Sequence, residues 1–356
     1  MNKMEQLQQK LPDRQAAALV WQPHTRRYLT GFDASDGYVL VTADAGYFMT
    51  DFRYIEAARA QVRGAQCGMY ERMEQTLQEQ LEKHGIRRLY VEETGLDLAT
   101  FHRFRSLLPE TEIVTDATLD RWLNELRLCK TAEEVEAIRE AQRLTDEGYT
   151  YILERIEPGR TEKEVALDLE FFMRRQGADA VSFDFIVVSG ANSSLPHGVP
   201  GDKKIERGDF VTMDFGALWH GWHSDMTRTV AVGSVSDEQR LVYDTVLQAQ
   251  LACLKMLKSG VSCKAADAAA REVIRAAGYG PYFGHSTGHG VGVEIHEMPR
   301  LSQGAGEDRL AVGNVVTVEP GIYLEGKFGV RIEDMVLITE NGIENFTKSP
   351  KNLTTL

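Results

Sequence analysis

The sequence predicts a two-domain protein of the α/β (α+β) class, with a small N-terminal α/β domain over residues 1–122 and a larger domain over residues 123–356. Its 356 residues exceed a typical single hydrophobic core, which holds roughly 100 to 200 residues. Short β-rich stretches alternate with helical ones in the first part of the chain. In the second part, three helix-start signals are followed by paired strand patterns, so we expect two domains.

The composition is typical of a packed globular protein without anionic partners. Hydrophobic residues make up 43% of the chain and charged residues 26%. The 53 acidic and 40 basic residues give a formal net charge of -13, which repels nucleic acids and anionic membranes. No segment resembles a secretion signal or a membrane span of about 20 apolar residues. We therefore expect a soluble, cytoplasmic protein without nucleic-acid or membrane partners.

The predicted first domain alternates strands with helices. Strand patterns lie at residues 18–22, 38–44, 46–52, 88–93 and 112–116, and helical patterns at Arg53–Val62 and Met73–His84. Such alternation is typical of a small α/β domain. A helical connector, Leu119–Leu128, follows, and we expect the domain boundary within it.

Three helices of the second domain are expected to begin at capping boxes. In a capping box, a Ser or Thr hydroxyl and a Glu or Gln side chain three residues later satisfy free amides of the first turn. The pairs are Thr131 with Glu134, Thr161 with Glu164, and Ser236 with Gln239.

A weak internal echo runs through the same domain, because four residues match others 101 positions later. The pairs are Gly159 with Gly260, Thr161 with Ser262, Lys163 with Lys264, and Gly177 with Gly278. Chance is one explanation, since glycines commonly follow helices. The alternative is an internal repeat, which predicts a pseudo-twofold domain with a site between its halves.

Four carboxylates interrupt apolar strand patterns in the second domain. FVTMDFGA and SDMTRTVAV flank a turn-like LWHGWH, so Asp214 and Asp225 are expected opposite each other on one face of a hairpin. Glu319 is expected at the end of the strand in VVTVEPGIY, and Glu333 inside the strand in VRIEDMVLIT. Each alone is more readily explained as a turn or edge residue. Together they predict a divalent-cation site, because buried unpaired carboxylates are costly.

A glycine-rich stretch adds imidazoles to these carboxylates. His285, His289 and His296 lie in GHSTGHGVGVEIHEMP, and His197 lies in SSLPHG. Glycines let the backbone approach a site closely, and histidines ligate metals, contact substrates or transfer protons. Four carboxylates and one imidazole suit two divalent ions about 3.5 to 4 Å apart, with Mn, Co, Fe and Zn all compatible by ligand type.

These segments resemble the signature motifs of the pita-bread metallopeptidases, specifically the prolidase and aminopeptidase P branch. The segments that carry the resemblance are MDFGALWHGWHSDMTRT, HSTGHGVGVEIHEMPR, TVEPGIY and GVRIED. The resemblance extends from about Lys130 to the C-terminus, and the preceding domain is similar in size and pattern to a creatinase-type N-terminal domain. It implies a pseudo-twofold pita-bread catalytic domain.

The resemblance also implies roles for individual residues. It implies two divalent metal ions, with Mn or Co expected first, held by Asp214, Asp225, His289, Glu319 and Glu333. The catalytic residues that it implies are His197, His296, Glu319 and Arg331. The implied substrate contacts come from His197, His285, His296 and Arg300, and from Phe183 in the proline pocket.

The implied activity is hydrolysis of Xaa-Pro bonds in di- or oligopeptides by a hydroxide that bridges the two metals. Arg300 looks like the prolidase arginine that grips a free C-terminal carboxylate, which favours an Xaa-Pro dipeptidase. The alternatives are a surface arginine and an Xaa-Pro aminopeptidase acting on longer peptides. A creatinase-like amidinohydrolase and an inert binding module both conflict with the complete ligand set. Members of this branch are typically homodimers, so we expect a homodimer here.

Overall fold

The computed structural model describes residues 1–356 and divides the chain into two compact units, Met1–Arg127 and Leu128–Leu356. The predicted boundary at residues 122 and 123 falls within helix α6 (Thr118–Leu128), and the first unit ends near the end of that helix. None of the helices is both long enough and apolar enough to span a membrane.

The first unit contains one six-stranded sheet in the order β4-β3-β2-β1-β5-β6. Strand β2 pairs antiparallel with β1 and β3, whereas the other neighbours pair in parallel. The strands are β1 (Ala16–Val20), β2 (Tyr38–Thr42), β3 (Gly46–Thr50), β4 (Gln66–Met69), β5 (Arg88–Val91) and β6 (Glu112–Val114). The helices besides α6 are α1 (Lys3–Gln8), α2 (Pro23–Thr30), α3 (Ile55–Gln61), α4 (Met73–His84) and α5 (Leu98–Leu107).

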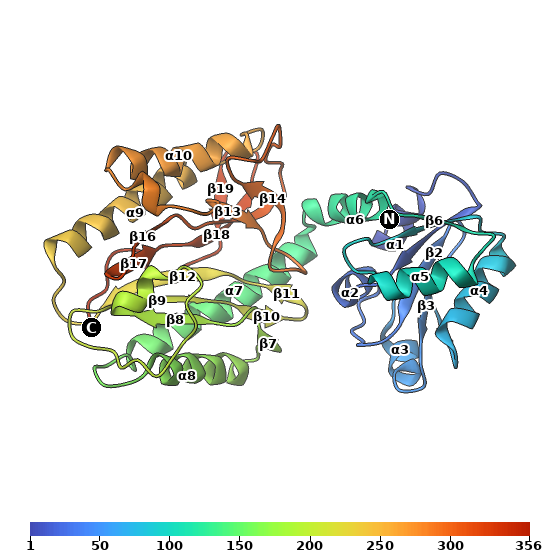
Figure 1. Cartoon of the computed structure of the whole chain (residues 1–356), viewed down its shortest axis with the longest axis horizontal. Coiled ribbons are helices and arrows are strands. Elements are labelled where there is room, and N and C mark those ends of the chain that lie inside the picture. The colour runs from blue at the N-terminus through green and yellow to red at the C-terminus, as the bar shows by residue number, and fades with distance from the viewer. The chain divides into compact units, whose positions relative to one another are not determined.

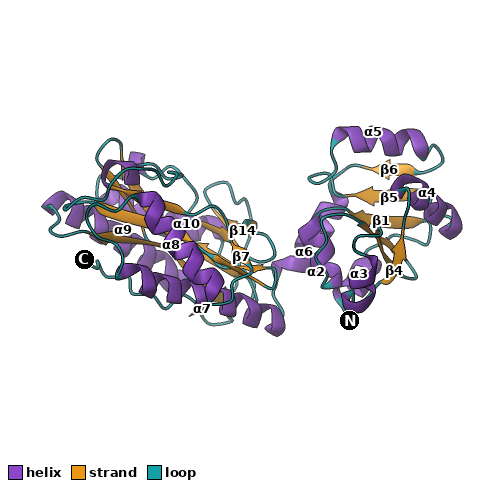
Figure 2. Cartoon of the chain, turned by 90° about the horizontal axis from the view of Figure 1, so that it is seen from below, coloured by secondary structure: helices purple, strands orange, loops and turns teal.

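Helices cover both faces of this sheet (Figure 2). Helices α1, α2, α3 and α6 bury residues such as Leu7, Leu29 and Leu123 in one core. On the other face, α4 and α5 bury Leu77 and Phe104. The apolar strand AAALV of β1 lies between the two cores and is buried along its whole length, as a central strand requires. The predicted α/β first domain is confirmed.

The second unit contains four long helices, two short 3₁₀ helices and thirteen strands. The helices are α7 (Ala132–Leu153), α8 (Glu162–Arg175), α9 (Asp237–Met256), α10 (Cys263–Ala276), η1 (Gly190–Ser194) and η2 (Gly280–Tyr282). The strands of its first half are β7 (Ala180–Val181), β8 (Ile186–Ser189), β9 (Phe210–Phe215), β10 (Ala217–Trp219), β11 (Trp222–His223) and β12 (Met226–Ala231). Those of its second half are β13 (Gly288–Gly290), β14 (Glu297–Leu301), β15 (Val315–Val318), β16 (Gly321–Leu324), β17 (Phe328–Arg331), β18 (Asp334–Ile338) and β19 (Ile343–Asn345).

All three predicted capping boxes are confirmed, with both reciprocal hydrogen bonds present at each. They begin α7 at Thr131, α8 at Thr161 and α9 at Ser236. These caps satisfy amides that would otherwise lack partners, and they fix where each helix starts.

The internal repeat is also visible in this unit. Each half runs helix, helix, then strands, with α7 and α8 on one side of the strands and α9 and α10 on the other (Figure 1). The echoed glycines share a left-handed backbone, with φ of 97° and 85° at Gly159 and Gly260 and of 111° and 87° at Gly177 and Gly278. The repeat, and not chance, explains the echo, and the predicted pseudo-twofold fold is confirmed.

Candidate metal centre

The two aspartates of the predicted hairpin lie on one strand pair, but not opposite each other. Asp214 lies in β9 with Thr227 of β12 as its cross-strand partner, and Asp225 immediately precedes β12. The predicted direct pairing is therefore wrong. Because Asp225 is two residues before Thr227, both aspartates still face the same side, along a diagonal. The hairpin bends at Gly216, where Ser224 O lies so close that a β-carbon would overlap it. Beyond this bend, β10 and β11 belong to a separate sheet with β7.

The two glutamates come from the second half of the repeat. Glu319 directly follows β15, as predicted. Glu333 lies between β17 and β18, so its predicted position inside a strand is wrong. The strand ends there because the chain leaves its partner β16 and joins β15, and Glu333 N donates instead to Thr227 O at 3.1 Å.

His289 of β13 places an unprotonated ring nitrogen next to these carboxylates. Its Nδ1 donates to Gly290 O at 3.0 Å, which leaves Nε2 as an acceptor. This Nε2 lies 3.4 Å from both Asp225 Oδ2 and Glu319 Oε1. Burial lowers the pKa of His289 to about 3, so a proton does not relieve the repulsion between the nitrogen and the two oxygens. A cation among these three atoms would relieve it.

The carboxylates lie where burial makes ionisation unfavourable unless a cation is nearby. Ligand atoms of Asp225, His289 and Glu333 all lie within 4.8 Å of one another. Burial, reinforced by neighbouring carboxylates, raises the pKa of Asp225 and of Glu333 well above the usual range. Burial raises the pKa of Glu319 to about 8. Asp214 Oδ1 and Glu333 Oε1 are buried without a hydrogen-bond partner. Orphaned acceptors around a neutral imidazole fit divalent cations by number and donor type.

Arg331 and Thr227 fix the outer sides of this cluster. Arg331 Nη2 donates to Asp214 Oδ2 at 2.7 Å, and its Nε donates to Thr227 Oγ1 at 3.0 Å. Thr227 Oγ1 in turn donates to Glu333 Oε2 at 2.7 Å. Thr227 does not stand out in the sequence, although its place two residues after Asp225 puts it on the same strand face.

Tyr323 continues the network toward the substrate side and was also missed. Its hydroxyl accepts from Arg331 Nη1 at 2.8 Å and lies 2.9 Å from His285 Nε2. His285 Nδ1 lies 2.8 Å from Ser286 O and must donate to it, so Nε2 accepts from the Tyr323 hydroxyl. Burial lowers the pKa of His285 to about 4 and raises that of Tyr323 to about 12, so both stay uncharged at neutral pH.

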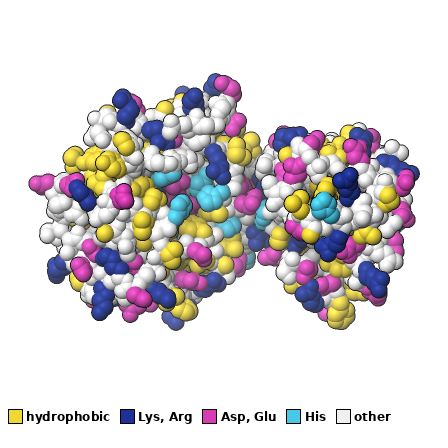
Figure 3. Space-filling model, in the orientation of Figure 1, with side chains coloured by type: hydrophobic (Ala, Val, Ile, Leu, Met, Phe, Trp, Pro, Cys, Tyr) yellow, Lys and Arg dark blue, Asp and Glu magenta, His cyan; other side chains and the backbone are white.

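A cavity of about 540 Å³ joins all the predicted site residues. Its lining includes Phe183, His197, Asp214, Asp225, His285, His289, His296, Arg300, Glu319, Arg331 and Glu333. In Figure 3, histidine side chains gather at a hollow on this face of the unit. The cavity wall combines these polar groups with apolar ones such as Phe185 and Ile295, which suits a small, partly apolar ligand.

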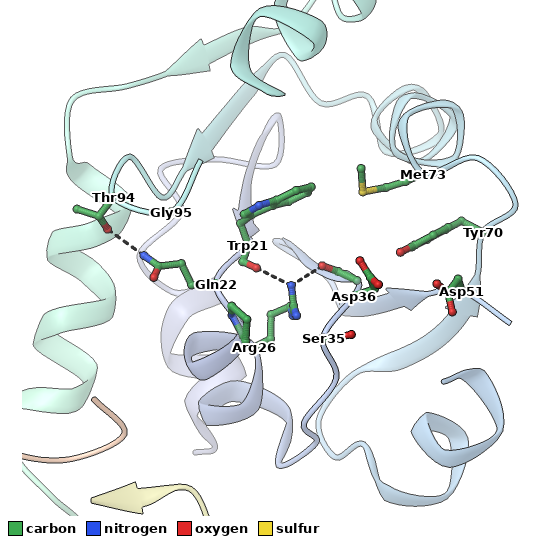
Figure 4. Close-up of a pocket in the computed structure, with 12 residues that line it drawn as sticks. Trp21, Gln22, Arg26, Ser35, Asp36, Asp51, Tyr70, Met73, Thr94 and Gly95 are labelled. Atoms are coloured by element: carbon green, nitrogen blue, oxygen red, sulfur yellow. Dashed lines mark hydrogen bonds between the residues drawn. The ribbon is translucent and has the colours of Figure 1, made fainter. Parts of the chain in front are cut away.

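Two larger cavities lack such a cluster. One of about 640 Å³ lies in the first unit (Figure 4), where buried Arg26 donates to backbone carbonyls and the rim carboxylates Asp36 and Asp51 both pair with Arg53. The other, of about 860 Å³, follows α7, where exposed glutamates pair with neighbouring arginines. Arginines pair with most carboxylates of these two cavities, whereas the smaller cavity holds buried carboxylate oxygens that lack any hydrogen-bond partner.

The fold and the cluster together define a metal-dependent hydrolase. Comparison with known proteins gives its family: residues 136–340 match metallopeptidase family M24, and residues 3–129 match the creatinase/prolidase N-terminal domain. The chain therefore belongs to metallopeptidase family M24, and the resemblance to its prolidase branch is confirmed.

Individual relatives agree over nearly the full length. The chain is 47% identical over 328 residues to the uncharacterized peptidase YqhT of Bacillus subtilis, a match that covers 92% of each protein. It is similar to a solved Xaa-Pro dipeptidase from Bacillus anthracis, with a TM-score of 0.95 and 42% identity over 99% of both chains. A solved X-Pro aminopeptidase from Thermotoga maritima gives a TM-score of 0.89 and 36% identity over 96% of this chain and 97% of that one.

Proposed function

We propose that this metallopeptidase hydrolyses Xaa-Pro bonds and acts mainly as an Xaa-Pro dipeptidase. The observation that carries the proposal is a cluster of four carboxylates, two of them buried, and a buried neutral imidazole beside a cavity whose wall includes Arg300. The similarity to the Bacillus anthracis protein, whose description is Xaa-Pro dipeptidase, supports it.

The proposed ligands of two divalent ions, Mn or Co, are Asp214, Asp225, His289, Glu319 and Glu333. When bound, the ions would supply a nucleophile from water at neutral pH and polarise the scissile carbonyl. The surrounding residues keep the ligands ready: Arg331 and Thr227 hold the outer oxygens of Asp214 and Glu333, and Gly290 O fixes the His289 tautomer. Glu319 is proposed to be catalytic as well as a ligand, because it lines the cavity.

Two histidines are the proposed partners of the reacting amide. The His296 ring packs edge-on against the His289 ring, with centroids 4.4 Å apart. Burial lowers the pKa of His296, so at neutral pH its ring is uncharged and can donate one N–H to the developing oxyanion. His197 would hold the substrate, and the Phe183 ring would contact the proline ring. The two nitrogens of His285 already have partners, so its ring would contact the substrate through carbon atoms. Proline suits this site because its tertiary amide needs no hydrogen-bond acceptor and its ring is rigid.

Arg300 supports the preference for dipeptides. It is the cross-strand partner of His289 between β14 and β13, and its side chain lines the cavity without an ion-pair partner. A guanidinium in this position can bind a carboxylate through two hydrogen bonds. Only a substrate that ends at proline presents its carboxylate there.

The decisive comparison uses an Xaa-Pro dipeptide and the same peptide extended by two residues, with Mn²⁺ and Co²⁺ supplied in turn. We expect metal-dependent release of the first residue, with a higher kcat/KM for the dipeptide. Full activity of metal-free protein, or no hydrolysis of either peptide, would remove the proposal.

The second candidate is an Xaa-Pro aminopeptidase, and the similarity to the Thermotoga maritima X-Pro aminopeptidase favours it. A higher kcat/KM for the extended peptide would select this activity. We also propose a homodimer, on the family resemblance alone, and light scattering of the purified protein tests it. The cytoplasmic location stays a prediction.

A further inference from the structure

The loop that carries His197 packs against β17 through its first turn, η1, whereas the residues around His197 are largely exposed. Residues 190–200 follow β8 and bring Pro196, His197 and Val199 to the cavity wall. Leu195 is 55% exposed and Val199 is 84% exposed, so the apolar side chains of this loop do not anchor it. The His197 ring makes no hydrogen bond to the protein. The loop backbone therefore determines where this imidazole lies.

Both ends of this loop are held by one buried carboxylate, that of Glu162 at the start of α8. Glu162 is 0% exposed. Its Oε1 accepts from Ser189 N at 2.7 Å and from Ser189 Oγ at 3.0 Å, at the beginning of the loop. Its Oε2 accepts from Gly201 N at 3.2 Å, at the end of the loop. Asn192 Nδ2 donates to both oxygens, at 3.1 and 3.2 Å.

The far side of the loop is joined to the metal cluster. Gly329 N donates to Ser193 Oγ at 2.9 Å, which attaches the loop to β17. Arg331 Nη1 donates to Pro196 O, the carbonyl directly before His197, at 3.3 Å. The same guanidinium donates to Asp214. The loop is therefore held by Glu162 at its two ends and by Arg331 next to His197.

We infer that Glu162 is a positioning residue that sets the place of His197 over the metal cluster by closing the base of this loop. A carboxylate is needed there because both of its oxygens accept hydrogen bonds from backbone amides, and an amide side chain offers only one oxygen. Burying a charge is costly unless such donors surround it, and here they do. The inference rests on the proposed function, since it assigns Glu162 an effect on the same reaction.

The test is Glu162→Gln, which keeps the shape of the side chain but turns one acceptor into a donor. Hydrogen exchange monitored by mass spectrometry should show faster exchange over residues 189–201. We expect kcat/KM for an Xaa-Pro dipeptide to fall about 10- to 100-fold, because a displacement of about 1 Å in a positioning group can cost that much. The same substitution made in a His197→Ala background should cost less than about 3-fold, since coupled residues are not additive.

Glu164→Gln is the matched control. Glu164 lies on the same helical turn, is exposed, and bonds only to Thr161. It should leave both loop exchange and kcat/KM unchanged. Unaltered exchange over residues 189–201 in Glu162→Gln overturns the inference, whatever the activity, and so do fully additive losses with His197→Ala. If the unmodified protein hydrolyses no Xaa-Pro peptide, the proposed function fails, while the exchange result still decides the role of Glu162.

Discussion

Burial disfavours the charged forms of the residues in the metal centre when no cation is bound. Burial raises the pKa of Asp225, Glu319 and Glu333 and lowers that of His289. Protonated carboxyls are poor ligands, whereas nearby divalent cations favour the ionised form. The carboxylates of the cluster can therefore all be ionised only when divalent cations are bound among them.

Arg300→Ala tests the residue that separates the two candidate activities. We expect kcat/KM for an Xaa-Pro dipeptide to fall about 10- to 100-fold, because a hydrogen bond to a charged group contributes about 1.5 to 3 kcal/mol. The peptide extended by two residues should lose less than about 3-fold, since it has no carboxylate at that position. Steady-state kinetics on both peptides measure this. Arg275→Ala, an exposed arginine paired with Glu272, is the control, and equal losses on both peptides would contradict the dipeptidase assignment.

The sequence patterns identified which residues form the site better than they predicted the position of each residue within a strand or loop. The carboxylates and histidines stand out because they interrupt apolar or glycine-rich stretches, and all of them line one cavity. VRIEDMVLIT reads as one strand, and only the change of partner from β16 to β15 places Glu333 in the break. Tyr323 and Glu162 could not be found in this way, because their roles depend on contacts with other segments of the chain, with His285 and Gly201 respectively.

At the scale of elements, capping signals predicted helix starts reliably, because each cap is a local set of hydrogen bonds. Thr131, Thr161 and Ser236 all accept from the third residue of their helices. Helix α2 lacks such a signal: Gln22 makes no side-chain cap, and the helix was missed. Helix α5 was missed although Asp97 caps it through Thr100 N, so there the signal was present in the sequence.

Ser236→Ala tests the cap of α9. Loss of the hydroxyl leaves Gln239 N without its acceptor, and we expect the free energy of unfolding to fall by about 1 kcal/mol. Urea denaturation measures the change, and kcat/KM should stay constant because Ser236 is not among the residues that line the cavity. Ser236→Asp keeps an acceptor and should cost little. A fall as large in Ser236→Asp as in Ser236→Ala would contradict this account.

At the scale of the whole molecule, the α/β class and the pseudo-twofold repeat followed from patterns that persist over many residues. The echoed glycines were readable because each needs a left-handed backbone, which glycine adopts without strain. The exact domain boundary near residues 122 and 123 stays a prediction. It lies inside α6, and a continuous helix gives no local signal of where one unit ends.

Metal binding should stabilise the folded chain measurably. At about 100 times its Kd, a ligand that binds only the folded state adds about 2.7 kcal/mol, which raises Tm by about 5 to 10 °C in a domain of this size. We expect this shift when Mn²⁺ is added to chelator-treated protein and followed by calorimetry. Glu333→Gln, which removes one proposed ligand, should lose most of it. An equal shift in both proteins would place the stabilising ions elsewhere.

The most direct test of the metal centre is a crystal structure of the protein grown with Mn²⁺, with anomalous scattering recorded at the manganese edge. We predict two anomalous peaks about 3.5 to 4 Å apart. Both should lie within bonding distance of the group formed by Asp214, Asp225, His289, Glu319 and Glu333. A well-ordered map with no peak among these side chains would contradict it.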